Sequence, residues 1–191
     1  MKNIILENEF IALQPIEKHH VEALYAVAQH EEIWTHMSDQ LTSLQAVEDY
    51  VDNALQERQQ GVSYKFVIFH KASNHVIGST SFLDISAAHK RIEIGSTWLT
   101  PSYWRTEVNT MCKYLLLQYC FEQLQLQRVQ IKTGHENIRS QRAIERLGAS
   151  KEGILRNHMR LRDGRIRHTV MYSITNEEWP AIKQKILHLM P

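Results

Sequence analysis

The sequence predicts one α+β (mixed α/β) domain, in which helices cover a largely antiparallel sheet. Three observations lead to this prediction. The chain has 191 residues, a length that fits a single domain over residues 1–191. Segments with strand-like alternation are interspersed with segments whose apolar residues recur every three or four positions. Three neighbouring strand candidates have short connections, which favours an antiparallel meander.

The first third of the chain predicts a short strand followed by two helices. Residues 10–14 form the strand, and an apolar stripe indicates a helix over residues 17–29. Ser43 is a typical N-cap for the second helix, which we expect to end at Gly61. Residues 31–40, between the two helices, have a mixed pattern.

The middle of the chain predicts the meander and then a long helix. The three strands are expected over residues 64–69, 75–85 and 92–99, with Gly78 at a bulge. In the third strand, Ile92, Ile94 and Trp98 lie near one phase of a two-residue period, so we expect them on one face. The helix is expected to open within residues 102–109.

The last third predicts a strand, a helix, a hairpin and a closing helix. Gly148 is expected to end the first helix, and Asp163 and Gly164 to form the hairpin turn. The expected ranges are 128–133 and 137–147 for the strand and helix, 150–161 and 167–174 for the hairpin, and 176–187 for the last helix.

Composition bears on several functional classes. The formal net charge of +1 argues against a protein that binds nucleic acid over its whole surface. No apolar run is long enough for a signal peptide or a membrane span, so we expect a cytoplasmic protein. Cys112 and Cys120 lie on one expected helix about 12 Å apart, which favours free thiols. None of the eleven histidines has metal-site spacing, so no metal is expected.

The start of the long helix is the first candidate for binding. The N–H groups at a helix N-terminus have no partner within the helix and carry partial positive charge. Such an end can bind a phosphate group. The alternative is an ordinary helix start, whose N–H groups are bound by caps and water.

Several short motifs follow one another through the second half of the chain. They are Ile92-Glu93-Ile94-Gly95 with Trp98-Leu99, Trp104-Arg105, Glu136-Asn137 with Ser140, the run Ala143 to Ala149, Glu152-Gly153 with Arg156, and Tyr172-Ser173-Ile174. Their order and spacing resemble the GNAT superfamily of acyl-CoA N-acyltransferases. The RimJ/RimL branch is the most similar, and its known members acetylate N-terminal amines of ribosomal proteins, while others act on small amines.

The resemblance implies the GNAT fold, with a V-shaped splay between the strands near residues 92–99 and 128–133. It implies that acetyl-CoA is the co-substrate and that its pantetheine arm enters the splay. The expected cofactor-binding residues are Thr97, Trp98, Leu99 and Asn137 for the pantetheine arm, and Arg105, Thr106, Val108, Asn109 and Thr110 for the pyrophosphate.

The expected pyrophosphate loop departs from the family pattern because it contains no glycine. Glycine permits backbone with positive φ and close approach to a phosphate. We expect Asn109 to supply the left-handed conformation instead. Glu107 would repel a pyrophosphate unless it points outward, and Arg105 and Lys113 would offset part of its charge.

Two side chains are the catalytic candidates. The resemblance places Glu93 opposite the acceptor amine, where it would act as general base directly or through water. The alternative is a surface glutamate paired with Lys90 or Arg91. The resemblance also implies that Ser140 reaches the thioester sulfur and helps return a proton to it. Asn137 has an alternative role as helix N-cap, and His135 is a minor alternative base.

The acceptor is expected to be a small amine or a protein N-terminus. Trp34, His36 and Met37 would border its pocket, or belong to the core. The expected partners are acetyl-CoA and this amine, without a membrane or a direct nucleic-acid partner; a homodimer stays open. Two other functions are a binding module that holds CoA poorly, and an RNA-associated protein. The second would use basic residues of one hairpin face, namely Arg156, His158, Arg160 and Arg162.

Overall fold

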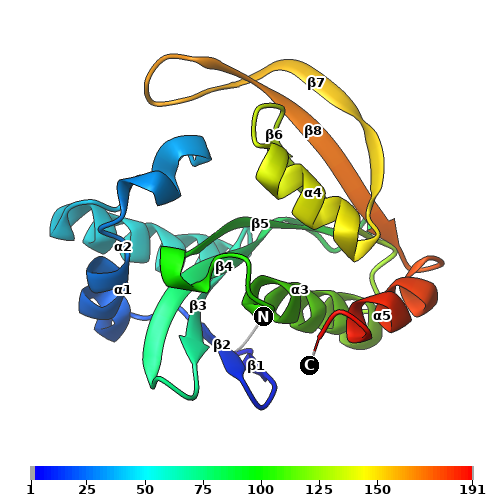
Figure 1. Ribbon diagram of the computed structural model, residues 1–191, viewed down its shortest axis with the longest axis horizontal. Helices are drawn as coiled ribbons and strands as arrows, with labels where there is room; N and C mark the ends of the chain where they lie inside the picture. The colour runs from blue at the N-terminus through cyan, green and yellow to red at the C-terminus, as the bar shows by residue number, and fades with distance from the viewer. Residues whose placement is uncertain (1–2, 191) are drawn as a thin grey trace.

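The computed structural model describes residues 3–190 and contains one eight-stranded sheet with the strand order β1-β2-β3-β4-β5-β6-β8-β7 (Figure 1). Neighbouring strands are antiparallel except β5 and β6, which are parallel. This confirms the predicted fold class. The strands are β1 Leu6–Glu7, β2 Ile11–Pro15, β3 Tyr64–His70, β4 His75–Ser86, β5 Arg91–Leu99, β6 Arg128–Gly134, β7 Ser150–Arg160 and β8 Ile166–Thr175.

The N-terminal helices follow the local signals of the sequence. Helix α1 covers only Val21–Val27 and follows a 3-10 turn, so it is shorter than predicted. Helix α2 covers Leu44–Gln60. The Ser43 hydroxyl accepts a hydrogen bond from the Ala46 N–H, and Gly61 has a φ of 72°, which confirms both predicted ends of α2.

Helices pack on both faces of the sheet. One core lies between the sheet and helices α3 (Val108–Gln118), α4 (Ile138–Leu147) and α5 (Trp179–Leu187). The other core lies under α1 and α2 and includes Trp34 and Trp98. Among residues 3–190, no helix combines the length and the apolar character that crossing a membrane requires.

A bulge in β5 corrects the predicted faces of that strand. Gly95 pairs with Ser81 and Trp98 pairs with Ser79, so two residues of β5 lie opposite the single residue between them on β4. Ser96 has a φ of 45° there. Ile92 and Ile94 therefore pack in the α3 core, whereas Trp98 packs in the α2 core. The prediction that these three side chains share a face is wrong, because the extra residue reverses the alternation.

The predicted bulge at Gly78 is confirmed. Ile68 pairs with Gly78 while Phe69 pairs with Val76, which leaves Ile77 as the extra residue of β4. A Cβ added at Gly78 would lie 2.1 Å from the backbone oxygen of Trp98. Glycine is required at this position because the neighbouring strand approaches too closely for any side chain.

The long helix α3 begins at Val108, near the end of the expected range. A 3-10 turn over Pro101–Tyr103 and a loop precede it, and a π-helical turn over Tyr119–Gln123 continues it. Cys112 and Cys120 are buried free thiols, as predicted. The last helix is shorter than predicted because the Glu178 carboxylate accepts hydrogen bonds from the N–H and hydroxyl of Thr175 and closes a turn before it.

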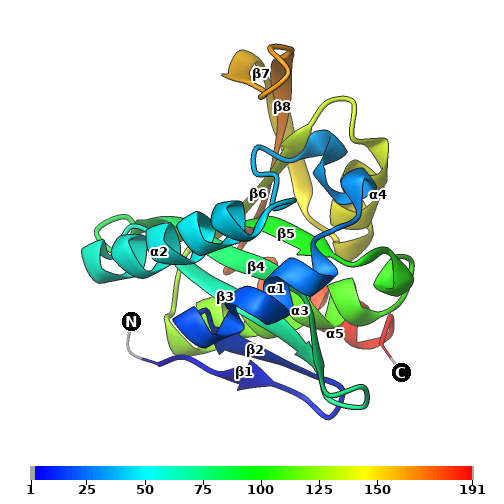
Figure 2. The ribbon, with the colours of Figure 1, turned by 90° about the vertical axis from the view of Figure 1, so that its left-hand side faces the viewer.

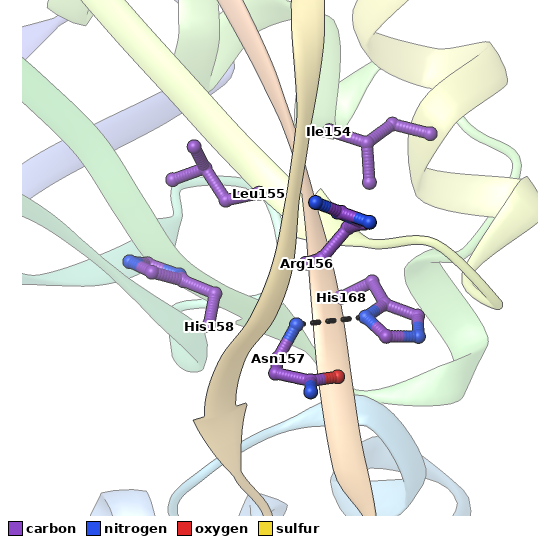
Figure 3. Close-up of a pocket in the computed structure, with 6 residues that line it drawn as sticks. All are labelled: Ile154, Leu155, Arg156, Asn157, His158 and His168. Carbon is purple, nitrogen blue, oxygen red and sulfur yellow. Dashed lines mark hydrogen bonds between the residues drawn. The ribbon is translucent and has the colours of Figure 1, made fainter.

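Strands β7 and β8 form a long hairpin whose tip projects beyond the rest of the molecule (Figure 2). Gly164 has a φ of 85° in the predicted turn. A bulge between Leu155 and Met159 interrupts β7, with Asn157 at a φ of 51°. Arg156 and His158 consequently point to opposite sides of the ribbon (Figure 3). The predicted single basic face of this hairpin is therefore wrong.

Candidate active site

The two parallel strands separate soon after they meet. Strands β5 and β6 pair at Arg91 with Arg128, Ile92 with Val129 and Glu93 with Gln130. Beyond these pairs no further ladder joins them within residues 3–190, although β5 continues to Leu99 and β6 to Gly134. Strand β8 pairs with β6 along its whole length and β4 pairs with most of β5, so each wall of the splay is supported from outside. The predicted V-shaped splay is confirmed (Figure 1).

Glu93 lies at the apex of the splay. Its side chain is 2% exposed, and its Oε2 lies 2.9 Å from the Lys132 ammonium and accepts a hydrogen bond from Gln130. The alternative pairing with Lys90 or Arg91 is wrong, because Arg91 pairs with Asp84. In the parallel register, Glu93 of β5 lies beside Gln130 of β6. Lys132 is two residues further along β6, so its side chain lies on the same face of the sheet as that of Glu93.

Thr97 occupies the opposite face of β5, because the bulge at Ser96 reverses the alternation. Its hydroxyl accepts a 2.7 Å hydrogen bond from the Lys113 ammonium and lies 2.7 Å from the Thr80 hydroxyl. Lys113 is 5% exposed, and burial lowers its pKa to about 8. Lys113 therefore binds β5 through Thr97, on the α3 face of the sheet. From the sequence we expected it to offset charge at the pyrophosphate loop.

The residue with left-handed backbone in the loop before α3 is not the predicted one. Arg105 has a φ of 62°, in the left-handed region, while Asn109 lies inside α3. The prediction that Asn109 replaces glycine is wrong, because the sharp turn comes before the helix. Glu107 occupies the N-cap position but its exposed carboxylate caps nothing in the described chain. The Thr106 hydroxyl accepts a hydrogen bond from the Val108 N–H at 3.4 Å, in the first turn of α3.

The other wall of the splay carries Asn137 at the start of α4. The Asn137 Oδ1 accepts a hydrogen bond from the Ser140 N–H at 3.1 Å, so the N-cap alternative is confirmed. This cap uses the carbonyl oxygen, and the amide N–H donors of Asn137 remain available to a ligand. Ser140 is half-buried one turn into the helix.

Side chains join the two walls across the open end of the splay. The Arg139 guanidinium lies 4.1 Å from the centre of the Trp104 ring, and Arg146 donates to the Thr110 hydroxyl at 3.4 Å. The Trp104 indole N–H donates to the carbonyl oxygen of Leu99. One of the backbone acceptors expected for pantetheine is therefore engaged by Trp104. The remaining bridges are long arginine side chains, which can move aside for a ligand.

The three residues expected around the acceptor separate into core and rim. Trp34 is buried, packs against Trp98 with ring centres 5.2 Å apart and the rings tilted by 57°, and donates its indole N–H to the carbonyl oxygen of Ala28, so it belongs to the core. Met37 is half-buried against the same core. His36 faces the hairpin and α4, where burial and the nearby charges of Arg165 and Arg139 lower its pKa.

A buried polar group next to Trp98 was not expected from the sequence. The Tyr50 hydroxyl lies 3.1 Å from the Ser79 hydroxyl, and burial raises the Tyr50 pKa to about 12. The Trp98 indole nitrogen and the Ser81 hydroxyl are buried and have no hydrogen-bond partner in the described chain. Tyr50 fits the apolar stripe of α2, so the sequence indicated only a core residue. These polar atoms lie on the α2 side of β4 and β5.

One surface hollow lies apart from the splay. A hollow on the hairpin is lined by residues 154–158 and His168, whose Nδ1 accepts a hydrogen bond from the Asn157 N–H (Figure 3). It is open and shallow, and Glu93 does not line it. Across residues 3–190, no group of three or more His, Cys, Asp or Glu side chains is arranged to hold a metal ion.

Comparison with known proteins gives a consistent family. A family model described as an acetyltransferase (GNAT) domain matches residues 11–150. The chain is 26% identical over 175 residues to the uncharacterized N-acetyltransferase YoaA of Bacillus subtilis (strain 168), covering 89% of this chain and 96% of that protein.

Solved structures agree with this result. A GCN5-related N-acetyltransferase from Brucella melitensis has a TM-score of 0.90 and 30% identity, covering 98% of this chain and 86% of that chain. RimL, a ribosomal L7/L12 alpha-N-protein acetyltransferase, has a TM-score of 0.81 at 22% identity, covering 91% and 94% of the two chains. The likeness to RimL shows a shared fold.

Proposed function

This chain belongs to the GNAT acetyltransferase family and uses acetyl-CoA as its acetyl donor, and from that premise we propose that its acceptor is a primary amine, on a small molecule or at a protein N-terminus. The observation that carries the proposal is the position of Glu93. It is a buried carboxylate at the apex of the splay, on the face opposite to α3 and α4. A donor entering along the α3 face would meet an acceptor from the Glu93 face at this point.

The residues around the splay fit an acyl-CoA substrate. The open edge of β5 offers backbone groups of Thr97 and Trp98 to the amides of a pantetheine arm. The Glu107 side chain accepts no hydrogen bond from the first turn of α3 in the described chain. The N–H groups of this turn therefore suit a pyrophosphate. Asn137 would donate its amide N–H groups from the other wall. The glycine-free loop gives no reason to prefer a module that cannot bind CoA, because Arg105 supplies the left-handed turn.

In the reaction, the amine nitrogen attacks the thioester carbonyl carbon and the carbon–sulfur bond then breaks. The proton lost by the amine passes to Glu93, directly or through water. The leaving thiolate takes a proton, for which the Ser140 hydroxyl on α4 is the candidate donor. A backbone N–H on the open edge of β5 would stabilise the oxyanion.

The use of a carboxylate as the base has a consequence for the acceptor. Carboxylates are weak bases, so they suit an amine that is already partly neutral. An α-amine, with an ordinary pKa of about 8, is already partly neutral at pH 7, whereas a lysine amine at about 10.4 is not. The site is therefore better suited to an α-amine or a similarly acidic amine than to a lysine side chain.

The test measures thiol release from acetyl-CoA against a panel of amines and peptides. Glu93→Gln should lower kcat by about a hundredfold, with acetyl-CoA affinity unchanged. Glu48→Gln, at an exposed carboxylate on α2, is the matched control and should leave kcat unchanged. If no member of the panel accelerates thiol release while acetyl-CoA still binds, the amine acceptor is refuted. An unchanged kcat for Glu93→Gln would remove Glu93 as the base.

A further inference from the structure

Arg167 is a cation on the acceptor side that the reaction above does not use. The last pair between β6 and β8 joins Gly134 to Thr169, and β8 continues beyond it towards the hairpin tip (Figure 1). Arg167 has the same parity as Thr169 and Met171, which pair with Gly134 and Lys132. Arg167 therefore extends from the sheet face that carries Lys132 and Glu93.

The Arg167 side chain lies over Gly134. A Cβ added at Gly134 would be 3.5 Å from the Arg167 Nε and 3.6 Å from its Cδ. These are van der Waals distances, so the Arg167 side chain lies against the end of β6. This places the cation close to the wall of the splay rather than in open solvent.

This guanidinium lacks a partner. The Arg167 Nε is buried and has no hydrogen-bond acceptor anywhere in residues 3–190. Burial lowers the Arg167 pKa, and the negative charge of Glu93 acts against this shift. A buried donor on a cation is costly when it is unpaired, so an arrangement of this kind is favourable when an anion completes it.

The neighbouring charges do not supply that anion. The Glu93 carboxylate is held by Lys132 at 2.9 Å. Arg165 is paired with both Asp163 and Glu136, at 2.7 and 3.2 Å. Arg139, from α4, is stacked on Trp104.

The other titratable groups on this side do not neutralise the positive charge of Arg167. His36 is kept neutral at pH 7, because burial and the nearby arginines lower its pKa. Asp39 is a half-buried carboxyl whose pKa burial raises, and the positive charges of Lys65 and Arg162 act against this shift. Arg167 is therefore a cation on this face that has no ion-pair partner within residues 3–190.

We infer that the acceptor carries a carboxylate or phosphate group close to its amine, and that Arg167 binds this anion while the amine faces Glu93. The inference rests on the proposed amine acetylation at the same site. It makes Arg167 a determinant of acceptor specificity. A guanidinium can bind a carboxylate or phosphate through two parallel N–H donors, which would fix the orientation of the amine as well.

The test compares matched pairs of amines that differ only in the anion. Amino acids are paired with their amides, aminoalkyl phosphates with the aminoalcohols, and peptides beginning with Asp with those beginning with Asn. The anionic member should react with a kcat/KM about tenfold higher or more. The preference cannot come from the fraction of neutral amine in the first pair, because an amino-acid amide has the more acidic amine.

Arg167→Gln should raise KM for the anionic amines about tenfold, with little change in kcat and with no change for neutral amines. Arg167→Lys should restore part of the preference. Arg165→Gln is the matched control, since Arg165 is already paired, and should keep the preference. Equal or better turnover of neutral amines or polyamines would overturn the inference, as would a preference that survives Arg167→Gln.

A binding measurement keeps the inference separate from the proposed reaction. The same amines are titrated into the full chain with CoA present, and acetyl-CoA binding is measured in parallel. Anionic amines should bind the wild-type protein and bind Arg167→Gln at least about tenfold more weakly. If no anionic amine binds in a manner that depends on Arg167, the inference fails even where acetyl transfer to other amines is found.

Discussion

Lys113 gives the sharpest prediction about stability, because it is a buried ammonium held by a hydroxyl. Its side chain is 5% exposed and its ammonium donates to Thr97, while burial lowers its pKa from 10.5 to about 8. Lys113→Met keeps the length of the side chain and removes the charge. We expect this variant to be more stable than the wild type at pH 7.

The magnitude follows from the pKa difference. A depression from 10.5 to about 8 corresponds to about 3 kcal/mol against folding while the amine is charged. Losing the hydrogen bond to Thr97 removes about 1 kcal/mol of stability. The net gain for Lys113→Met at pH 7 is therefore about 2 kcal/mol.

The sign of the pH dependence follows from proton binding. Below pH 8 both the folded and the unfolded state carry the proton, so the full cost of the buried charge is present. Between pH 8 and 10.5 the unfolded state binds more proton than the folded state, so the wild-type stability rises with pH. The advantage of Lys113→Met should shrink across this window, and the variant should be the less stable protein above it.

The assay is urea denaturation of both proteins at intervals from pH 7 to pH 10.5. Subtracting the two free energies of unfolding removes the titration of groups that both proteins share. Lys151→Met, at an exposed lysine, should show a small difference that does not vary with pH. If the difference in the free energy of unfolding between Lys113→Met and the wild type stays constant from pH 7 to 10.5, the conclusion that Lys113 is a buried, charged ammonium is refuted.

Two further substitutions test the backbone and the cofactor wall. Gly78→Ala should destabilise the protein by about 3 kcal/mol or more in denaturant melts, because its Cβ would meet the Trp98 oxygen; a change below about 1 kcal/mol would contradict the strand geometry. Asn137→Ala should cost about 1 kcal/mol through the lost cap and should weaken acetyl-CoA binding. Asn137→Ser should restore the cap and leave CoA binding weak, so equal recovery of both would assign Asn137 to the cap alone.

Local signals in the sequence predicted most of the elements correctly. Ser43 and Gly61 mark the ends of α2 because capping depends on residues within one turn. Gly164 marks the hairpin turn for the same reason. The order of elements, with three antiparallel strands before the splay, also follows from short connections that leave few topologies.

The errors come from interactions between distant segments. The bulge at Ser96 depends on how β5 aligns with Ser79 and Ser81, and no glycine marks it. A charged residue in the left-handed region, Arg105, could not be anticipated from residue preferences. The partner of Glu93 is Lys132, on β6. Helix α3 separates β5 from β6 in the sequence, so this ion pair depends on the tertiary fold.

The bulge explains how one strand presents different residues to the two faces of the sheet. Before Ser96, β5 directs Glu93 and Gly95 to the α2 face and Ile94 to the α3 face; after it, Thr97 takes the α3 face and Trp98 the α2 face. An uninterrupted strand would place Trp98 over α3 and would separate Thr97 from Lys113. The extra residue thus keeps Trp98 and Glu93 on the α2 face, while Thr97 remains on the α3 face, where Lys113 binds its hydroxyl.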